Sequence, residues 1–196
     1  MKAVIYIHGK GGTAEEAKHY EALFPGHTVL GFDYKADTPW DAQKEFTEYC
    51  RAMQRDFDSI TIVANSIGAF FAVVSLNREP IEKAYFISPV VNMEKLIADM
   101  MQWANVTECM LEKAGTIETE FGETLSWEYL SWIRKHPIEW NIPTSVLYGQ
   151  KDHLQSFETI SAFSKATGAE LTVMENGEHW FHTEEQMAFL DRWIRR

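Results

Sequence analysis

Ser66 lies between a segment typical of a buried strand and a segment typical of a buried helix. Residues 60–64 are short, β-branched and apolar on both faces, as expected for a central parallel strand. Residues 69–74 continue apolar without a helix breaker. Ala64 and Gly68 are small enough to allow a tight strand-to-helix turn that would lift the serine hydroxyl above a sheet. The pattern predicts that Ser66 is a nucleophile.

A serine hydroxyl is a weak nucleophile, so it needs a base, and the base needs a carboxylate to orient it. Asp152 comes just after the strand expected at 144–148, and His179 lies in the loop after the strand expected at 170–174. The carboxyl ends of parallel strands share one edge of the sheet, where open α/β sheets bind ligands. We therefore expect Ser66, Asp152 and His179 to meet at that edge.

Each partner has an alternative. Asp152 also suits the cap of the following helix, and Asp33, at the end of another expected strand, is its main rival as the acid. His182, three residues after His179, is the rival base. Loop context favours Asp152, and the Gly-x-His spacing favours His179.

Two backbone N–H groups are needed to stabilise the oxyanion that forms during acyl transfer. Ile67 directly follows the nucleophile at the start of its helix and would supply one of them. The glycine-rich loop at 8–12 would supply the other, from Lys10 or, as second choice, from Gly11. We expect His8, in the same loop, to brace it rather than to act as a base.

Strand and helix signals alternate along most of the chain, which predicts an α/β fold with a doubly wound, mainly parallel sheet of about six strands. Thr13 and Glu16 have the spacing of a capping box, at the start of an expected helix that ends near Pro25. The expected strands are residues 3–7, 28–33, 60–64, 83–88, 144–148 and 170–174.

Residues 92–137 separate two expected strands by more than a simple crossover requires. Apolar residues at helical spacing predict one helix from Met93 to about Ala104 and a second around Leu130. We expect a helical cap insertion over the carboxyl ends of the strands, in which Met100 and Trp103 line an apolar pocket for an acyl substrate. The surplus of acidic residues in this segment disfavours highly anionic substrates.

The composition indicates a single folded domain over residues 1–196, since 45% of the residues are hydrophobic and 13% aromatic. A net charge of −11 argues against nucleic acid or an anionic membrane as the main partner. A strand is expected directly after Met1, and no apolar run approaches the ~20 residues that span a bilayer, so we expect a cytoplasmic protein. Cys50 and Cys109 lack metal-ligand spacing, and we expect both to be reduced packing residues.

Four motifs occur in one order: His-Gly at 8–9, small-x-Ser-x-Gly at 64–68, Gly-x-x-Asp at 149–152 and Gly-x-His at 177–179. In these the chain resembles the α/β-hydrolase superfamily over nearly its whole length. The resemblance implies a Ser66–Asp152–His179 triad with the amides of Lys10 and Ile67 as oxyanion donors. We expect no cofactor, and the histidines lack the spacing of an HExxH-type metal site. Ala64 stands where the family commonly has Gly, and the antiparallel N-terminal strand pair of larger members is absent.

The expected function is therefore that of a serine hydrolase that cleaves a small ester or other acyl compound through an acyl-enzyme. Acyl transfer, or another reaction on the same triad, is the alternative within enzymes. A binding module on an inactive hydrolase scaffold is the alternative from another class, because fold alone does not fix function. The complete set of Ser, Asp and His favours an enzyme with a small-molecule substrate.

Overall fold

The computed structural model describes all residues from Met1 to Arg196, and these form two units. The first unit joins Met1–Val91 to Glu139–Arg196, and the second is Asn92–Ile138.

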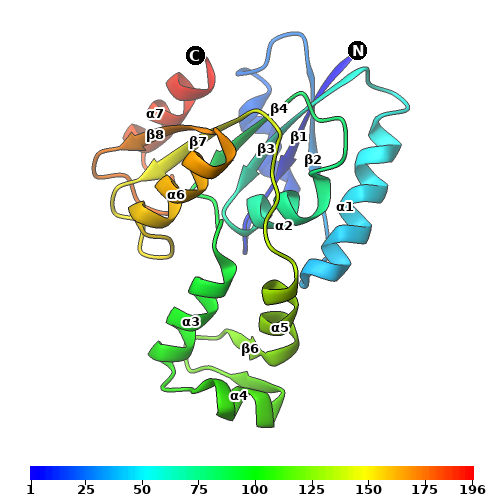
Figure 1. Cartoon of the computed structure of the whole chain (residues 1–196). Coiled ribbons are helices and arrows are strands. Elements are labelled where there is room, and N and C mark those ends of the chain that lie inside the picture. The colour runs from blue at the N-terminus through cyan, green and yellow to red at the C-terminus, as the bar shows by residue number, and fades with distance from the viewer. The chain divides into compact units, whose positions relative to one another are not determined.

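A six-stranded sheet in the order β2-β1-β3-β4-β7-β8 forms the first unit, and every neighbouring pair is parallel (Figure 1). The prediction of an α/β fold with a parallel sheet of about six strands is confirmed. Because all strands run the same way, the loops that follow them leave from one edge. The strands are β1 (Lys2–Ile7), β2 (Thr28–Phe32), β3 (Ser59–Asn65), β4 (Lys83–Ile87), β7 (Thr144–Gly149) and β8 (Glu170–Met174).

Helices cover both faces of this sheet, as the burial of its central strands requires. Right-handed crossovers place α1 (Pro39–Met53), α2 (Ile67–Leu76) and α6 (Phe157–Thr167) on one face. There Phe46 of α1 packs edge-on against Phe71 of α2, with ring centroids 6.0 Å apart.

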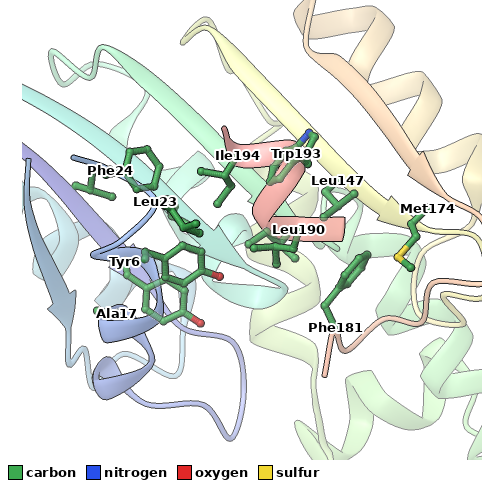
Figure 2. Close-up of a cluster of buried hydrophobic side chains, with 14 residues drawn as sticks. Tyr6, Ala17, Leu23, Phe24, Leu147, Met174, Phe181, Leu190, Trp193 and Ile194 are labelled. Atoms are coloured by element: carbon green, nitrogen blue, oxygen red, sulfur yellow. The ribbon is translucent and has the colours of Figure 1, made fainter. Parts of the chain in front are cut away.

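The opposite face carries a short 3₁₀ helix, η1 (Ala14–Tyr20), and the last helix, α7 (Glu184–Ile194). Their side chains join those of the strands in one hydrophobic cluster, part of which Figure 2 shows. Trp193 of α7 lies edge-on to Tyr85 of β4, with ring centroids 5.5 Å apart. Burial of this apolar surface fixes α7 against the sheet.

The first connection differs from the prediction. The capping box between Thr13 and Glu16 forms, but the helix is 3₁₀ and ends at Tyr20 rather than near Pro25. A Cβ on Gly31 of β2 would lie 2.0 Å from the Ala14 carbonyl oxygen, so the start of η1 lies directly against this strand. The sequence around Ala14 does not indicate this contact, because Gly31 belongs to the next strand of the chain.

The second unit contains three helices and a two-stranded antiparallel hairpin. Two of the helices, α3 (Met93–Trp103) and α5 (Trp127–Lys135), match the expected ones, whereas α4 (Glu108–Ala114) and the hairpin of β5 (Thr116–Glu118) and β6 (Thr124–Ser126) were not predicted. Arg134 of α5 forms ion pairs with Glu94 of α3 and Glu108 of α4, which ties the three helices together. The core of the unit includes Leu111, Leu125 and Leu130.

In neither unit does any helix have the length and apolar character needed to cross a membrane.

The two cysteines have opposite environments. Cys50 is buried on α1, and burial raises the pKa of its thiol to about 11. Cys109 on α4 is exposed, so the expectation that both cysteines are packing residues is wrong for Cys109. The helical pattern was right, but a helix of seven residues buries only one stripe, and here that stripe contains Leu111.

We predict that Ellman's reagent titrates one thiol in the native protein and two in denaturant, because only the thiolate of an accessible cysteine reacts quickly. Cys109→Ser should remove the fast reaction, and Cys50→Ser should leave it unchanged. Rapid native reaction of the Cys109→Ser variant would contradict the buried position of Cys50.

Candidate active site

The backbone of Ser66 is held in a conformation that residues other than glycine rarely adopt, with φ 51° and ψ −119°. Such a backbone costs on the order of 1–3 kcal/mol and persists only where its surroundings fix it. The Ser66 amide donates to the Ile87 carbonyl at 3.0 Å, and its carbonyl accepts from the amides of Ala69 and Val90, both at 3.1 Å. These bonds attach the turn to α2 and to the segment that follows β4.

Two glycines allow the loop after β1 to lie against this turn. A Cβ on Gly9 would lie 3.1 Å from the Cβ of Ser66, and one on Gly68 would lie 2.4 Å from the His8 carbonyl oxygen. Any side chain at Gly68 would therefore push this loop away from the serine. The close approach explains why small residues surround Ser66.

The Ser66 hydroxyl points to a histidine rather than to its own helix. Serine at a helix N-cap usually accepts a bond from the helix backbone, but Ser66 forms no such cap bond. Its Oγ lies 2.8 Å from Nε2 of His179, whose Nδ1 lies 2.7 Å from Oδ2 of Asp152. A carboxylate only accepts, so Nδ1 carries the proton and the neutral ring accepts the serine proton at Nε2.

Exposure decreases along this chain of hydrogen bonds. The His179 side chain is 21% exposed, whereas the Asp152 side chain is fully buried. Oδ1 of Asp152 accepts from the amides of Leu154 at 2.8 Å and Gln155 at 3.2 Å. The buried carboxylate is thereby satisfied on one oxygen and leaves the other for the imidazole.

The loops that carry Asp152 and His179 are joined through their backbones. The Lys151 amide donates to the Gly177 carbonyl at 2.7 Å. A Cβ on Gly149 would lie 2.4 Å from the Glu178 carbonyl oxygen, so only glycine allows this approach. The distance between the carboxylate and the imidazole is thus set by backbone contact between the two loops.

The glycine-rich loop forms a tight turn beside the serine. The Gly12 amide donates to the Gly9 carbonyl at 3.1 Å, and Gly11 has φ +74° at the third position, where a type II turn requires a positive φ. Lys10 and Gly11 are the two central residues of this turn. Ile67, the first residue of α2, has an amide without a partner inside the helix. The role of the Ile67, Lys10 and Gly11 amides as oxyanion donors remains a prediction.

His8 braces the loop, as expected. Its Nδ1 donates to the Gly9 carbonyl at 2.9 Å, and its ring stacks on Tyr34 with centroids 4.4 Å apart. The Tyr34 hydroxyl donates to the His8 carbonyl at 2.9 Å, and burial raises the pKa of this phenol. The contribution of Tyr34 was not predicted, because no spacing or motif connects it to the loop.

No protein-family model matches the sequence. Among solved structures, Est1E from Butyrivibrio proteoclasticus aligns with a TM-score of 0.76 and 17% identity, over 99% of this chain and 85% of that protein. Mouse alpha/beta hydrolase domain-containing protein 10 aligns with a TM-score of 0.67 and 16% identity, over 98% and 87%. This chain has the α/β-hydrolase fold. The resemblance seen in the sequence is confirmed at the level of the fold.

One curated protein of Mycoplasma genitalium, named "Putative esterase/lipase 3", is 30% identical over 81 residues. The match covers 40% of this chain and 29% of that protein. A second structure of Est1E has ferulic acid bound to it and aligns with a TM-score of 0.68 and 15% identity, over 100% of this chain and 87% of that one.

Asp33 and His182, the rival acid and the rival base, take no part in the series of hydrogen bonds that joins Ser66, His179 and Asp152. Asp33 is exposed and pairs with Lys35 at 2.8 Å, and the hydrogen bond from that lysine lowers the pKa of the carboxyl. His182 is exposed, and its Nδ1 lies 2.7 Å from the Trp180 carbonyl. The structure brings together Ser66, His179 and Asp152 and leaves Asp33 and His182 outside.

Met100 and Trp103 belong to the second unit, on α3. Met100 is half-buried, and Trp103 is exposed and lies edge-on to Phe121 at 6.1 Å between ring centroids. Their assignment to a substrate pocket remains a prediction. Across both units, no three His, Cys, Asp or Glu side chains are grouped as metal ligands would be.

We predict that Gly149→Ala separates the Asp152 and His179 loops, because the new methyl group has no room against the Glu178 carbonyl. The Lys151 amide, which bonds across the two loops, should exchange with solvent at least tenfold faster by hydrogen-exchange measurement. Lys113→Ala, at an exposed position of α4 in the second unit, is the control. Unchanged exchange at Lys151 would contradict the backbone contact.

Proposed function

We propose that this protein is a serine hydrolase that cleaves small esters through a covalent acyl-enzyme. One observation carries the proposal: the unbroken series of hydrogen bonds from Ser66 through His179 to Asp152. It lies on loops that leave the carboxyl edge of a parallel sheet, where α/β folds bind their ligands.

In the first half-reaction, Ser66 Oγ attacks the carbonyl carbon of the ester while Nε2 of His179 takes the serine proton. Asp152 orients the imidazole and stabilises the positive charge that it gains. The carbonyl π electrons move to oxygen, and the amides of Ile67 and Lys10 would donate to this oxyanion, with Gly11 as the second choice. When the tetrahedral intermediate collapses, the ester C–O bond breaks and the alcohol leaves with the proton from His179.

In the second half-reaction, water attacks the acyl-Ser66 ester. His179 takes the proton of this water and then returns a proton to Ser66 Oγ, which releases a carboxylic acid. Every group in both halves is a residue of this chain, the ester or water. The fixed geometry of the three side chains removes most of the entropic cost of bringing base and nucleophile together.

The charge of the chain bears on the substrate. A net charge of −11 disfavours polyanionic substrates, so we propose uncharged esters. Ferulic acid, bound to Est1E, is a carboxylic acid, the class of product that ester hydrolysis releases. The mycoplasmal relative also has a name that indicates esters, although it shares only a segment with this chain.

Ser66→Ala should abolish both covalent labelling by a fluorophosphonate probe and hydrolysis of p-nitrophenyl acetate, because no other hydroxyl is paired with His179. Ser161→Ala on α6 is the control and should retain full activity. Labelling of the Ser66→Ala variant at the native rate would contradict the assignment. A native protein that neither labels nor hydrolyses would indicate a binding module, and faster acyl capture by an added alcohol than by water would indicate a transferase.

Asp152→Asn should lower kcat by as much as ~10⁴-fold, because an amide can present a donor to Nδ1 and favour the wrong imidazole tautomer. Asp33→Asn should change kcat less than about twofold, since Asp33 bonds only to a surface lysine. Steady-state kinetics of both variants on one ester measures the two changes in kcat. A larger loss of kcat in Asp33→Asn than in Asp152→Asn would overturn the choice of acid.

His179→Ala should remove turnover, whereas His182→Ala should retain most of it. Since the base must be neutral to accept the serine proton, kcat/KM of the native enzyme should fall toward acid pH and level off on the alkaline side. A pH–rate profile of native protein and His182→Ala checks this, and the two curves should coincide. If the fall in kcat/KM at acid pH disappears in His182→Ala, then His182 and not His179 is the base.

A further inference from the structure

A second set of hydrogen bonds lies behind the glycine-rich loop. The Tyr6 hydroxyl donates to one oxygen of the Glu16 carboxylate, and the other oxygen accepts from the Thr13 amide at 3.3 Å. We call these two side chains the Tyr6–Glu16 pair. The carboxylate thus connects β1 to the chain directly after the loop.

Tyr6 is a fixed support for this carboxylate. It is 2% exposed on β1 and stacks on Tyr20 with ring centroids 5.0 Å apart, and it lies within the cluster of Figure 2. Burial and the neighbouring acid raise the pKa of its phenol, so the hydroxyl stays protonated and remains a donor. Tyr6 lies on β1, which pairs along its length with β3, the strand that ends at Asn65 directly before the nucleophile.

The Glu16 carboxylate also lies against the loop itself. A Cβ on Gly12 would lie 2.9 Å and 3.2 Å from its two oxygens and 3.1 Å from the Cβ of His8. Gly12 closes the turn that contains Lys10 and Gly11. The pair therefore connects β1, the strand beside the one that leads into the nucleophile turn, to the end of the glycine-rich turn.

We propose that Tyr6 and Glu16 are positioning residues that hold the oxyanion-binding turn at its distance from Ser66. The inference rests on the proposed function, since it concerns the donors at Lys10 and Gly11. Such donors must lie about 3 Å from the oxygen of the transition state, so a small displacement weakens stabilisation of the transition state more than binding of the ester.

Helix capping alone does not account for this arrangement. A capping box needs only Thr13 and Glu16, whereas here the carboxylate also accepts from Tyr6 on the central sheet. The adjacent Glu15 forms only an exposed ion pair with Lys18 of the same helix. Glu15 therefore provides a matched control on the same turn of η1.

The test compares Tyr6→Phe, Glu16→Ala, Glu16→Gln and Glu15→Ala in p-nitrophenyl ester hydrolysis, with thermal unfolding measured for each. Tyr6→Phe keeps the buried ring and removes only the hydroxyl. We expect kcat to fall about tenfold or more in Tyr6→Phe and Glu16→Ala, with KM within about twofold of native. Glu16→Gln, which can still accept from Thr13, should lose less, and Glu15→Ala should match the native enzyme.

The double variant Tyr6→Phe/Glu16→Ala should be no slower than Glu16→Ala alone, because both changes remove the same support. Native kcat in Tyr6→Phe, or losses that simply multiply in the double variant, would overturn the inference even if the melting temperature falls. If Glu16→Ala does not fold, the isosteric Tyr6→Phe decides alone. A native protein without Ser66-dependent turnover would instead overturn the proposed function, and this inference with it.

Discussion

The positive φ of Ser66 is the constraint on which the rest of the site depends. A strand that continued straight would bury this hydroxyl in the sheet, and a normal helix start would use it as a cap. The turn is held because β3 is central, with the end of β1 on one side and the end of β4 on the other. Backbone bonds to Ile87 and Val90 and the close approach of Gly9 all come from these neighbours. The cost of the strained backbone is met by the packing of three strand ends.

The same sheet edge brings together groups of very different exposure. Asp152 is buried and fixed by two backbone amides, whereas His179 and Ser66 are only partly buried and reachable by a substrate. A carboxylate in a fixed, dry position interacts strongly with an imidazole that becomes charged. Contact between the Gly149 and Gly177 backbones supplies the precision that flexible side chains alone would lack. The division between rigid support and accessible nucleophile is what the proposed chemistry requires.

Local patterns predicted all six strands of the sheet to within about a residue, because continuous β-branched and apolar runs leave few alternatives for a buried parallel strand. They also brought Ser66, Asp152 and His179 to one edge, since each follows a strand. They could not predict the 3₁₀ form of η1, the brace from Tyr34 or the contact of Gly149 with Gly177. Each of these depends on two segments that approach closely in space but carry no shared pattern in sequence. Cys109 shows the same limit, because periodicity identified a helix but not which face of it is buried.

The proposed covalent intermediate is tested most directly by rapid-quench mass spectrometry during hydrolysis of p-nitrophenyl acetate. The account predicts an acetyl adduct of the native protein within the first turnover, located on the peptide that contains Ser66. Its amount should decay as the ester is exhausted. Turnover with no adduct, or an adduct on another residue such as Cys109, would contradict catalysis by an acyl-enzyme at Ser66.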